Sequence, residues 1–210
     1  MKRILFGGSF DPVHAAHLAV AEAAARLLGA DRVSFLPASS PPHKPGGTAA
    51  SAEDRLEMLR RAVAGTGLLD VLDAEIVRGG TSYTYDTVKT LLDGPCRGDS
   101  LILLLGQDQL ADLASWRNAR ALAALVPIAV APRPGAPEPP WEALAAALGD
   151  EAARGIRSRV LPLPASPISS TEVRRRVAEG KSVRCWVPDP VADWIEERGL
   201  YRGGGAAGRS

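Results

Sequence analysis

The sequence predicts a single α/β domain built on a doubly wound, Rossmann-like parallel sheet. Strand-like apolar runs alternate with helical patterns from the N-terminus to about residue 160. The segment 100–105 carries five consecutive apolar residues, which is typical of a strand that is buried on both faces. A length of 210 residues is enough for one domain with a full core. In such a fold we expect ligands at the carboxyl ends of the strands, where the strand order reverses.

The first elements form a βαβ unit. A strand at Arg3–Phe6 is followed by a helix from His14 to Leu28 and a second strand from Arg32 to Leu36. A capping box at Ser51 opens the next helix, which we expect to end near Ala64. The later expected elements are a strand over 71–77, a helix over 84–92, strands over 100–105 and 126–131, helices over 118–125 and 141–148, and a last strand over 157–161. Five prolines between 132 and 140 predict an extended loop outside the sheet interior.

A helical C-terminal part over about 169–199 is expected to complete the domain, which we place at 1–202. Ser169 and Glu172 form a capping box for one helix, and Pro188 begins the final helix, which ends near Gly199. The segment 203–210 has nothing to bury, so we expect a flexible tail there.

Composition excludes several classes of protein. Lys+Arg 25 against Asp+Glu 24 gives a net charge of +1, which disfavours a polybasic nucleic-acid binder, so we expect no nucleic-acid partner. Cys96 and Cys185 form no metal-binding pair, so no protein metal site is predicted. The chain has neither a membrane-length apolar run nor a signal-peptide pattern, so we expect no membrane partner and a cytoplasmic location. All three histidines, His14, His17 and His43, lie near the N-terminus.

Two of these histidines lie where the first strand turns into the first helix. Gly7 and Gly8 allow the backbone to approach a ligand, and the helix N-terminus offers free N–H groups to phosphate. His14 and His17 are three residues apart, so they share one face of that helix end and can donate hydrogen bonds to phosphate oxygens. The plainer interpretation of such a pair is helix capping or partial burial. The stretch matches neither the P-loop nor the GxGxxG pattern.

The stretch GGSFDPVHAAH at 7–17 resembles the signature of the nucleotidyltransferases that carry the HxGH motif. It is most similar to the bacterial nicotinate-nucleotide adenylyltransferases. Further matches follow in order: PPHK at 41–44, SYTYDT at 82–87, GQD at 106–108 with Trp116 after it, and ISSTEVR at 168–174. Ala16 departs from the family, which usually has glycine there. Its methyl group lies where the helix is expected to meet the adenine ring, and one methyl is small enough to be tolerated.

The resemblance implies transfer of the adenylyl group of ATP to nicotinate mononucleotide, giving nicotinate adenine dinucleotide and pyrophosphate in NAD biosynthesis. It implies His14, His17 and Arg174 as catalytic residues and Mg²⁺ bound mainly through the ATP phosphates. The ATP site would comprise Gly7, Gly8, Ser9, Phe10, His43, Lys44, Gly106, Asp108, Ile168, Ser169 and Ser170. The mononucleotide site would comprise Thr84, Trp116, Arg117 and Arg133.

Plainer roles stand beside several of these assignments. Arg174 fits a phosphate contact or the exposed basic face of a capped helix, and Trp116 fits stacking on the pyridine ring or core packing. Asp108 can hold ribose, reach the metal through water, or cap a helix. The segment His43–Lys44 fits a lid over the phosphates or a solvent loop. Asp11 we interpret as a turn former before a proline.

The sequence is also compatible with two other functions and with more than one oligomeric state. A related transferase acting on phosphopantetheine would keep both histidines but would have no use for SYTYDT and Trp116. A catalytically silent nucleotide-binding protein would result if Ala16 had spoiled the adenine site. A homo-oligomer is compatible with the sequence.

Overall fold

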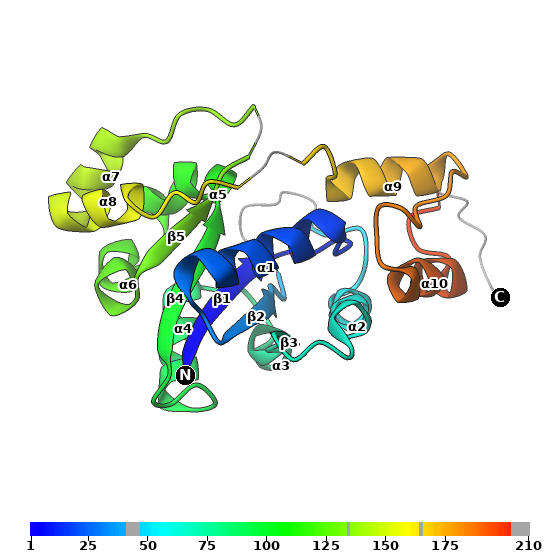
Figure 1. Ribbon diagram of the computed structural model, residues 1–210, viewed down its shortest axis with the longest axis horizontal. Helices are drawn as coiled ribbons and strands as arrows, with labels where there is room; N and C mark the ends of the chain where they lie inside the picture. Colours follow the sequence, from blue (N-terminus) through cyan, green and yellow to red (C-terminus); the bar gives the residue numbers. More distant parts are fainter. Residues whose placement is uncertain (41–46, 134, 164–165, 203–210) are drawn as a thin grey trace.

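The computed structural model describes residues 1–40, 47–133, 135–163 and 166–202, in which five parallel strands form one sheet in the order β3-β2-β1-β4-β5 (Figure 1). The strands are β1 (Lys2–Gly8), β2 (Arg32–Pro37), β3 (Leu69–Val71), β4 (Ser100–Gly106) and β5 (Ile128–Ala131). From β1 the chain proceeds to β2 and β3 on one side and then returns to β4 on the other. The predicted reversal of strand order therefore lies between β1 and β4.

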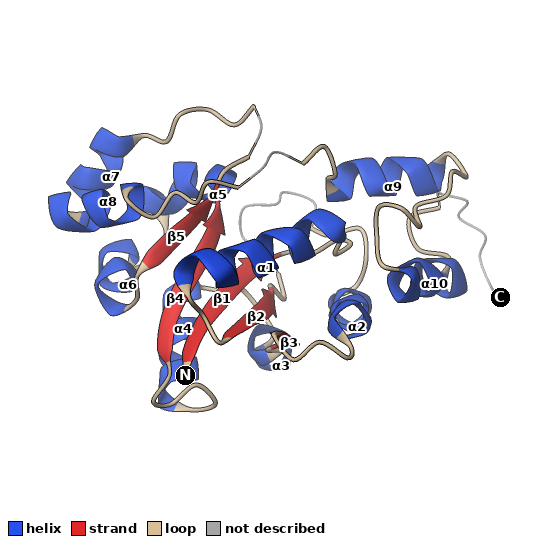
Figure 2. Cartoon of the chain, viewed as in Figure 1, coloured by secondary structure: helices blue, strands red, loops and turns tan. Residues whose placement is uncertain are grey.

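Helices cover both faces of this sheet (Figure 2). They are α1 (Ala15–Leu28), α2 (Ala52–Val63), α3 (Ala74–Arg78), α4 (Thr84–Asp93), α5 (Gln107–Asp112), α6 (Ala119–Leu125), α7 (Trp141–Leu148), α8 (Asp150–Arg157), α9 (Ser170–Ala178) and α10 (Asp189–Arg198), with a 3₁₀ turn η1 at Leu113–Ser115. The doubly wound α/β prediction is confirmed. No helix in the described ranges is long and apolar enough to cross a membrane.

The strands divide their side chains between two apolar clusters, one on each face. Ile4 and Phe6 of β1 belong to the first cluster, whereas Leu5 between them belongs to the second, as the two-residue period of a strand requires. The first cluster is shared with buried residues of α1, α2, α9 and α10, and the second with those of α4, α6, α7 and α8. Both faces of the sheet are therefore buried under apolar side chains, which explains why β4 is continuously apolar.

Two of the expected strands are wrong in whole or in part. The segment 71–77 was expected to be a strand, but β3 ends at Val71 and 74–78 form α3, because β3 pairs with β2 over three residues only. The segment 157–161 was expected to be a strand, but it makes a single parallel bridge between Val130 and Val160. Pro162 follows directly and cannot donate a ladder hydrogen bond, so pairing does not extend. The expected tail, 203–210, lies outside the described residues.

Candidate active site

The chain leaves β1 at Gly8 and enters α1 through the segment Ser9–Val13, which we call the histidine loop because it leads directly into His14. It starts at the carboxyl end of β1, beside the carboxyl end of β4, with which β1 pairs up to Phe6 and Leu104. The N-terminus of α1 and the residues after Gly106 thus meet where the strand order reverses, the place at which folds of this type bind ligands.

The two histidines stack on each other at the start of α1. The ring centroids of His14 and His17 are 3.7 Å apart and the ring planes are inclined by 22°. His14 is the N-cap residue, and its backbone N–H donates to Nδ1 of His17 at 3.3 Å. Because Nδ1 of His17 accepts this bond, a neutral His17 ring carries its proton on Nε2. The sequence prediction that both imidazoles share one face of the helix end is confirmed.

His14 is only 5% exposed. Burial and, to a smaller extent, the positive charge of Arg133 together lower its pKa to about 4. Nδ1 of this ring is buried and has no hydrogen-bond partner within the described part of the chain. His14 is therefore neutral at physiological pH, and it can offer a hydrogen bond but no positive charge.

Gly7 and Gly8 differ in what surrounds them. A Cβ on Gly8 would lie 2.8 Å from Cζ of Phe10, whose ring is buried edge-on against His17 at a centroid distance of 5.1 Å. A Cβ on Gly7 would meet nothing within 4 Å. Gly8 is thus required by packing, while the open space at Gly7 suits the close approach of a ligand that we expect there.

The N-terminus of α9 lies against the histidine loop. Nη1 of Arg174 donates to the carbonyl oxygen of Asp11 at 2.7 Å, and Oγ of Ser170 donates to that of Pro12 at 2.9 Å. Oγ of Ser169 accepts from the backbone N–H of Glu172 at 3.2 Å, so the predicted N-cap is confirmed. The ISSTEVR segment therefore contacts the histidine loop, from which 158 to 163 positions of sequence separate it.

A second group follows β4 and β5. Nη1 of Arg133 lies 2.8 Å from Oδ2 of Asp108, and both side chains are 54% exposed. The effect of Arg133 on the pKa of His14 places this pair within electrostatic reach of the histidines. A Cβ on Gly106 would lie 2.5 Å from Oδ1 of Asp108, so with any other residue here the exposed carboxylate would have to turn away from this position.

Of the residues expected to bind the mononucleotide, Arg117 contacts the helix that begins at Thr84. Thr84 is the first residue of α4, and Arg117 reaches the same helix through Asp86, with 3.4 Å between Nη1 and Oδ2. The guanidinium of Arg117 also lies 4.7 Å from the ring centroid of Tyr83. Trp116 is half-buried against the second apolar cluster. His43 and Lys44 lie outside the described residues.

Sequence reasoning missed two buried charged residues that support these loops. Arg55 on α2 is fully buried and donates to the carbonyl oxygens of Ser9 and Ser39, at 2.7 and 3.1 Å. Glu75 on α3 is buried and accepts from Oγ1 of Thr87 at 2.8 Å, and burial raises its pKa. The available signal was positional, because Arg55 precedes Leu59 by four residues on the apolar face of its helix.

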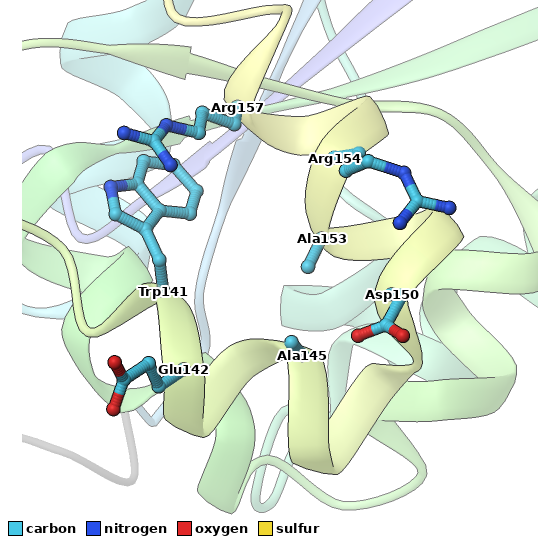
Figure 3. Close-up of a pocket in the computed structure, with 7 residues that line it drawn as sticks. All are labelled: Trp141, Glu142, Ala145, Asp150, Ala153, Arg154 and Arg157. Carbon is cyan, nitrogen blue, oxygen red and sulfur yellow. The ribbon is translucent and has the colours of Figure 1, made fainter.

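A separate cavity of about 200 Å³ lies between α7 and α8 (Figure 3). The guanidinium of Arg157 lies 5.4 Å from the ring centroid of Trp141 at its edge. None of the residues that we predict for the site lines it, and we assign it no function.

Comparison with known proteins agrees with this arrangement. The family model described as cytidylyltransferase-like matches residues 5–176. The chain is 42% identical over 198 residues to a protein of Bordetella pertussis named "Probable nicotinate-nucleotide adenylyltransferase", covering 94% of this chain and 96% of that protein. A protein of Bordetella petrii with the same name is 45% identical over 205 residues, covering 96% and 100% of the two chains.

Among solved structures, the fold is similar to that of the nicotinic acid mononucleotide adenylyltransferase of Plasmodium falciparum complexed with NaAD. The TM-score is 0.71 and the identity 19%, with 97% of this chain and 99% of that one covered. This structural similarity shows the fold alone. The family is shown by the matched family model and by the Bordetella relatives. The chain belongs to the cytidylyltransferase-like family and, within it, to the nicotinate-nucleotide adenylyltransferases.

Proposed function

We propose that this protein transfers the adenylyl group of ATP to nicotinate mononucleotide, forming nicotinate adenine dinucleotide and pyrophosphate in NAD biosynthesis. The observation that carries the proposal is the stacked pair of His14 and His17 at the N-terminus of α1, beside the carboxyl ends of β1 and β4. Family membership adds the identity of the reaction, because the Bordetella relatives bear the name of this activity.

In the reaction, a phosphate oxygen of nicotinate mononucleotide attacks the α-phosphorus of ATP. The bond from that phosphorus to the oxygen bridging the α- and β-phosphates breaks, and pyrophosphate leaves with the electron pair. The attacking phosphate is already a competent nucleophile, so the chain has to align the reactants and stabilise charge on the phosphoryl oxygens. No covalent intermediate with a side chain is needed.

The histidines supply directed hydrogen bonds to these oxygens. Since Nδ1 of His17 accepts from the backbone of His14, the ring can donate from Nε2. Neutral His14 donates one N–H, and the free N–H groups at the start of α1 add positive potential at the same end of the helix. Positive charge for the phosphates would come from Arg174, with Ser169 and Ser170 beside it at the start of α9.

Mg²⁺, which neutralises phosphate charge when it is bound, would be held mainly by ATP itself. Within the described ranges no three His, Cys, Asp or Glu side chains are grouped so that they could hold a metal ion. Asp108 is the carboxylate that the sequence suggests for contact through water, and it already faces Arg133.

On the acceptor side, we expect Trp116 to stack on the pyridine ring and the backbone N–H groups near Thr84 and Arg117 to receive its carboxylate. The contact of Arg117 with Tyr83 and Asp86 supports this, because it holds the two segments side by side. N–H donors favour a carboxylate over the carboxamide of nicotinamide mononucleotide. Arg133 would bind the mononucleotide phosphate. Since both substrates are charged nucleotides, we place the reaction in the cytoplasm.

The experiment is a comparison of acceptors. Purified protein with ATP and Mg²⁺ is given nicotinate mononucleotide, nicotinamide mononucleotide or phosphopantetheine, and pyrophosphate release is followed. We expect the fastest release with nicotinate mononucleotide. If no pyrophosphate is released with any of the three acceptors, the enzyme hypothesis is refuted and a catalytically silent nucleotide-binding protein is favoured. Preference for phosphopantetheine would assign the chain to another branch of the family.

A further inference from the structure

The histidine loop has no regular secondary structure, yet it sets the position of His14. We propose that Tyr201, at the opposite end of the described chain, is a positioning residue that holds this loop in its reactive geometry through Asp11. The inference rests on the proposed function, because it assigns a role in adenylyl transfer to a residue outside every motif of the family resemblance.

Asp11 is the centre of this arrangement. It is 2% exposed, and its carboxylate accepts hydrogen bonds from two segments of the chain that are distant in sequence. Oδ1 accepts from the hydroxyl of Tyr201 at 2.8 Å and from the backbone N–H of Ala50 at 3.1 Å, and Oδ2 accepts from that of Ala49 at 2.8 Å. A buried carboxylate is costly unless its oxygens are paired, so each donor constrains where Asp11 can lie. Asp11 lies in a turn, as expected from the sequence, and its carboxylate also accepts hydrogen bonds from other parts of the chain.

The carbonyl oxygens of the loop are also held from outside. That of Ser9 accepts from Arg55, that of Asp11 from Arg174 and that of Pro12 from Ser170, at 2.7, 2.7 and 2.9 Å. These donors fix the backbone from two sides, α2 and α9. Tyr201 is the donor that ties the end of the chain to the side chain of Asp11, and the two residues are 190 positions apart.

The backbone at Tyr201 shows that its geometry is imposed. The chain leaves α10 through Gly199, and Tyr201 has a φ of 62°, a left-handed conformation that is uncommon for residues other than glycine. Such a conformation persists only where surrounding contacts over-determine it. Those contacts are the packing of the ring against the first apolar cluster and the bond to Asp11.

The hydroxyl is also a constant donor. Burial and the neighbouring charge of Asp11 raise the pKa of Tyr201 well above its usual range. The phenol therefore stays protonated at every pH at which an enzyme of this kind would be assayed, and its contact with Asp11 is maintained across the pH profile. Loss of the hydroxyl should loosen the loop and misplace His14 and His17, which affects the rate of transfer more than the binding of the acceptor.

The test is Tyr201→Phe, which removes the hydroxyl and keeps the ring. We expect kcat to fall about tenfold, as a displacement of catalytic groups does, with KM for nicotinate mononucleotide changed by less than about twofold. Amide hydrogen exchange of a peptide covering 9–14 should become faster. The matched control is Thr66→Val, which removes hydrogen bonds to the carbonyl oxygens of Val63 and Leu69, away from the loop, and should leave kcat and exchange of 9–14 unchanged.

A second variant tests the route through Asp11. Asp11→Ala should lower kcat at least as much as Tyr201→Phe, and the double variant should be no slower than Asp11→Ala alone, since both changes remove the same contact. Single effects that multiply in the double variant would overturn the proposal, as would a kcat of Tyr201→Phe equal to that of Thr66→Val. Failure of the wild-type protein to release pyrophosphate would instead refute the proposed function, so the two failures are distinguishable.

Discussion

The buried position of His14 makes the stability of the protein depend on pH in a way that can be calculated. Its pKa falls from the ordinary value of 6.5 to about 4 in the folded chain, chiefly through burial. Between these values the unfolded chain binds a proton at His14 and the folded chain does not. The free energy of unfolding therefore rises with pH in this window. The contribution of His14 is present in full above about pH 6.5 and is lost as the pH falls towards 4.

The size of the effect follows from the two pKa values. At pH 5 nearly all unfolded molecules carry the proton on His14 and about a tenth of folded ones do, whereas at pH 7 most molecules of both states are neutral there. The difference in proton binding corresponds to about 2 kcal/mol of unfolding free energy between pH 7 and pH 5. Because the side chain is almost completely buried, we apply no reduction for solvent screening.

The assay is urea unfolding at both pH values for the wild type and for His14→Asn. Asparagine does not titrate and is a favoured N-cap residue, so it suits the position of His14 at the start of α1. The variant is less well packed and therefore less stable at every pH. Between pH 7 and pH 5, however, its free energy of unfolding should fall by about 2 kcal/mol less than that of the wild type. Equal losses in the two proteins would refute a buried, neutral His14.

Three further predictions concern the site. His17→Ala should lower kcat by about a hundredfold through loss of a donor to the transition state, and a change confined to KM for ATP would contradict this role. Trp116→Ala should raise KM for nicotinate mononucleotide while the dissociation constant for ATP, measured by calorimetry, stays the same; equal weakening of both would identify a core residue. Gly8→Ala should cost about 1–3 kcal/mol in urea unfolding, since its Cβ would meet the ring of Phe10 at 2.8 Å. Gly7→Ala, with no atom within 4 Å, is the matched control and should unfold like the wild type.

The fold was predictable where local pattern and burial agree. The apolar run of β4 and the alternation of strands with helices define a parallel sheet covered on both faces, and the structure has it. The two errors, at 71–77 and 157–161, concern the sheet edges β3 and β5. At an edge, the extent of a strand depends on how far one neighbour pairs with it, which local propensity does not encode.

The site divides in the same way. His14 and His17 are close because they are three positions apart at one helix end, and this spacing can be read directly from the sequence. The supports of the histidine loop come from α2, α9 and the residues after α10, so no local pattern could reveal them. For Arg174 the sequence suggests a phosphate contact or an exposed basic face, and the structure adds a contact that neither includes, because Nη1 donates to the carbonyl oxygen of Asp11.

The burial of His14 determines whether the histidines bind phosphate by charge or by hydrogen bonding. With a net charge of +1, positive potential for a triphosphate has to be local, and its expected sources in the sequence are the helix N-termini, His14, His17, Lys44 and Arg174. His14 is neutral because it is buried, so its ring supplies a hydrogen bond and no positive charge. Among the described residues expected to bind phosphate, the cations are Arg174 and Arg133, each already held by an oxygen of Asp11 or Asp108. We infer that the histidines contribute donor geometry and the arginines contribute charge, so a histidine variant should impair the rate and an arginine variant the binding of phosphate.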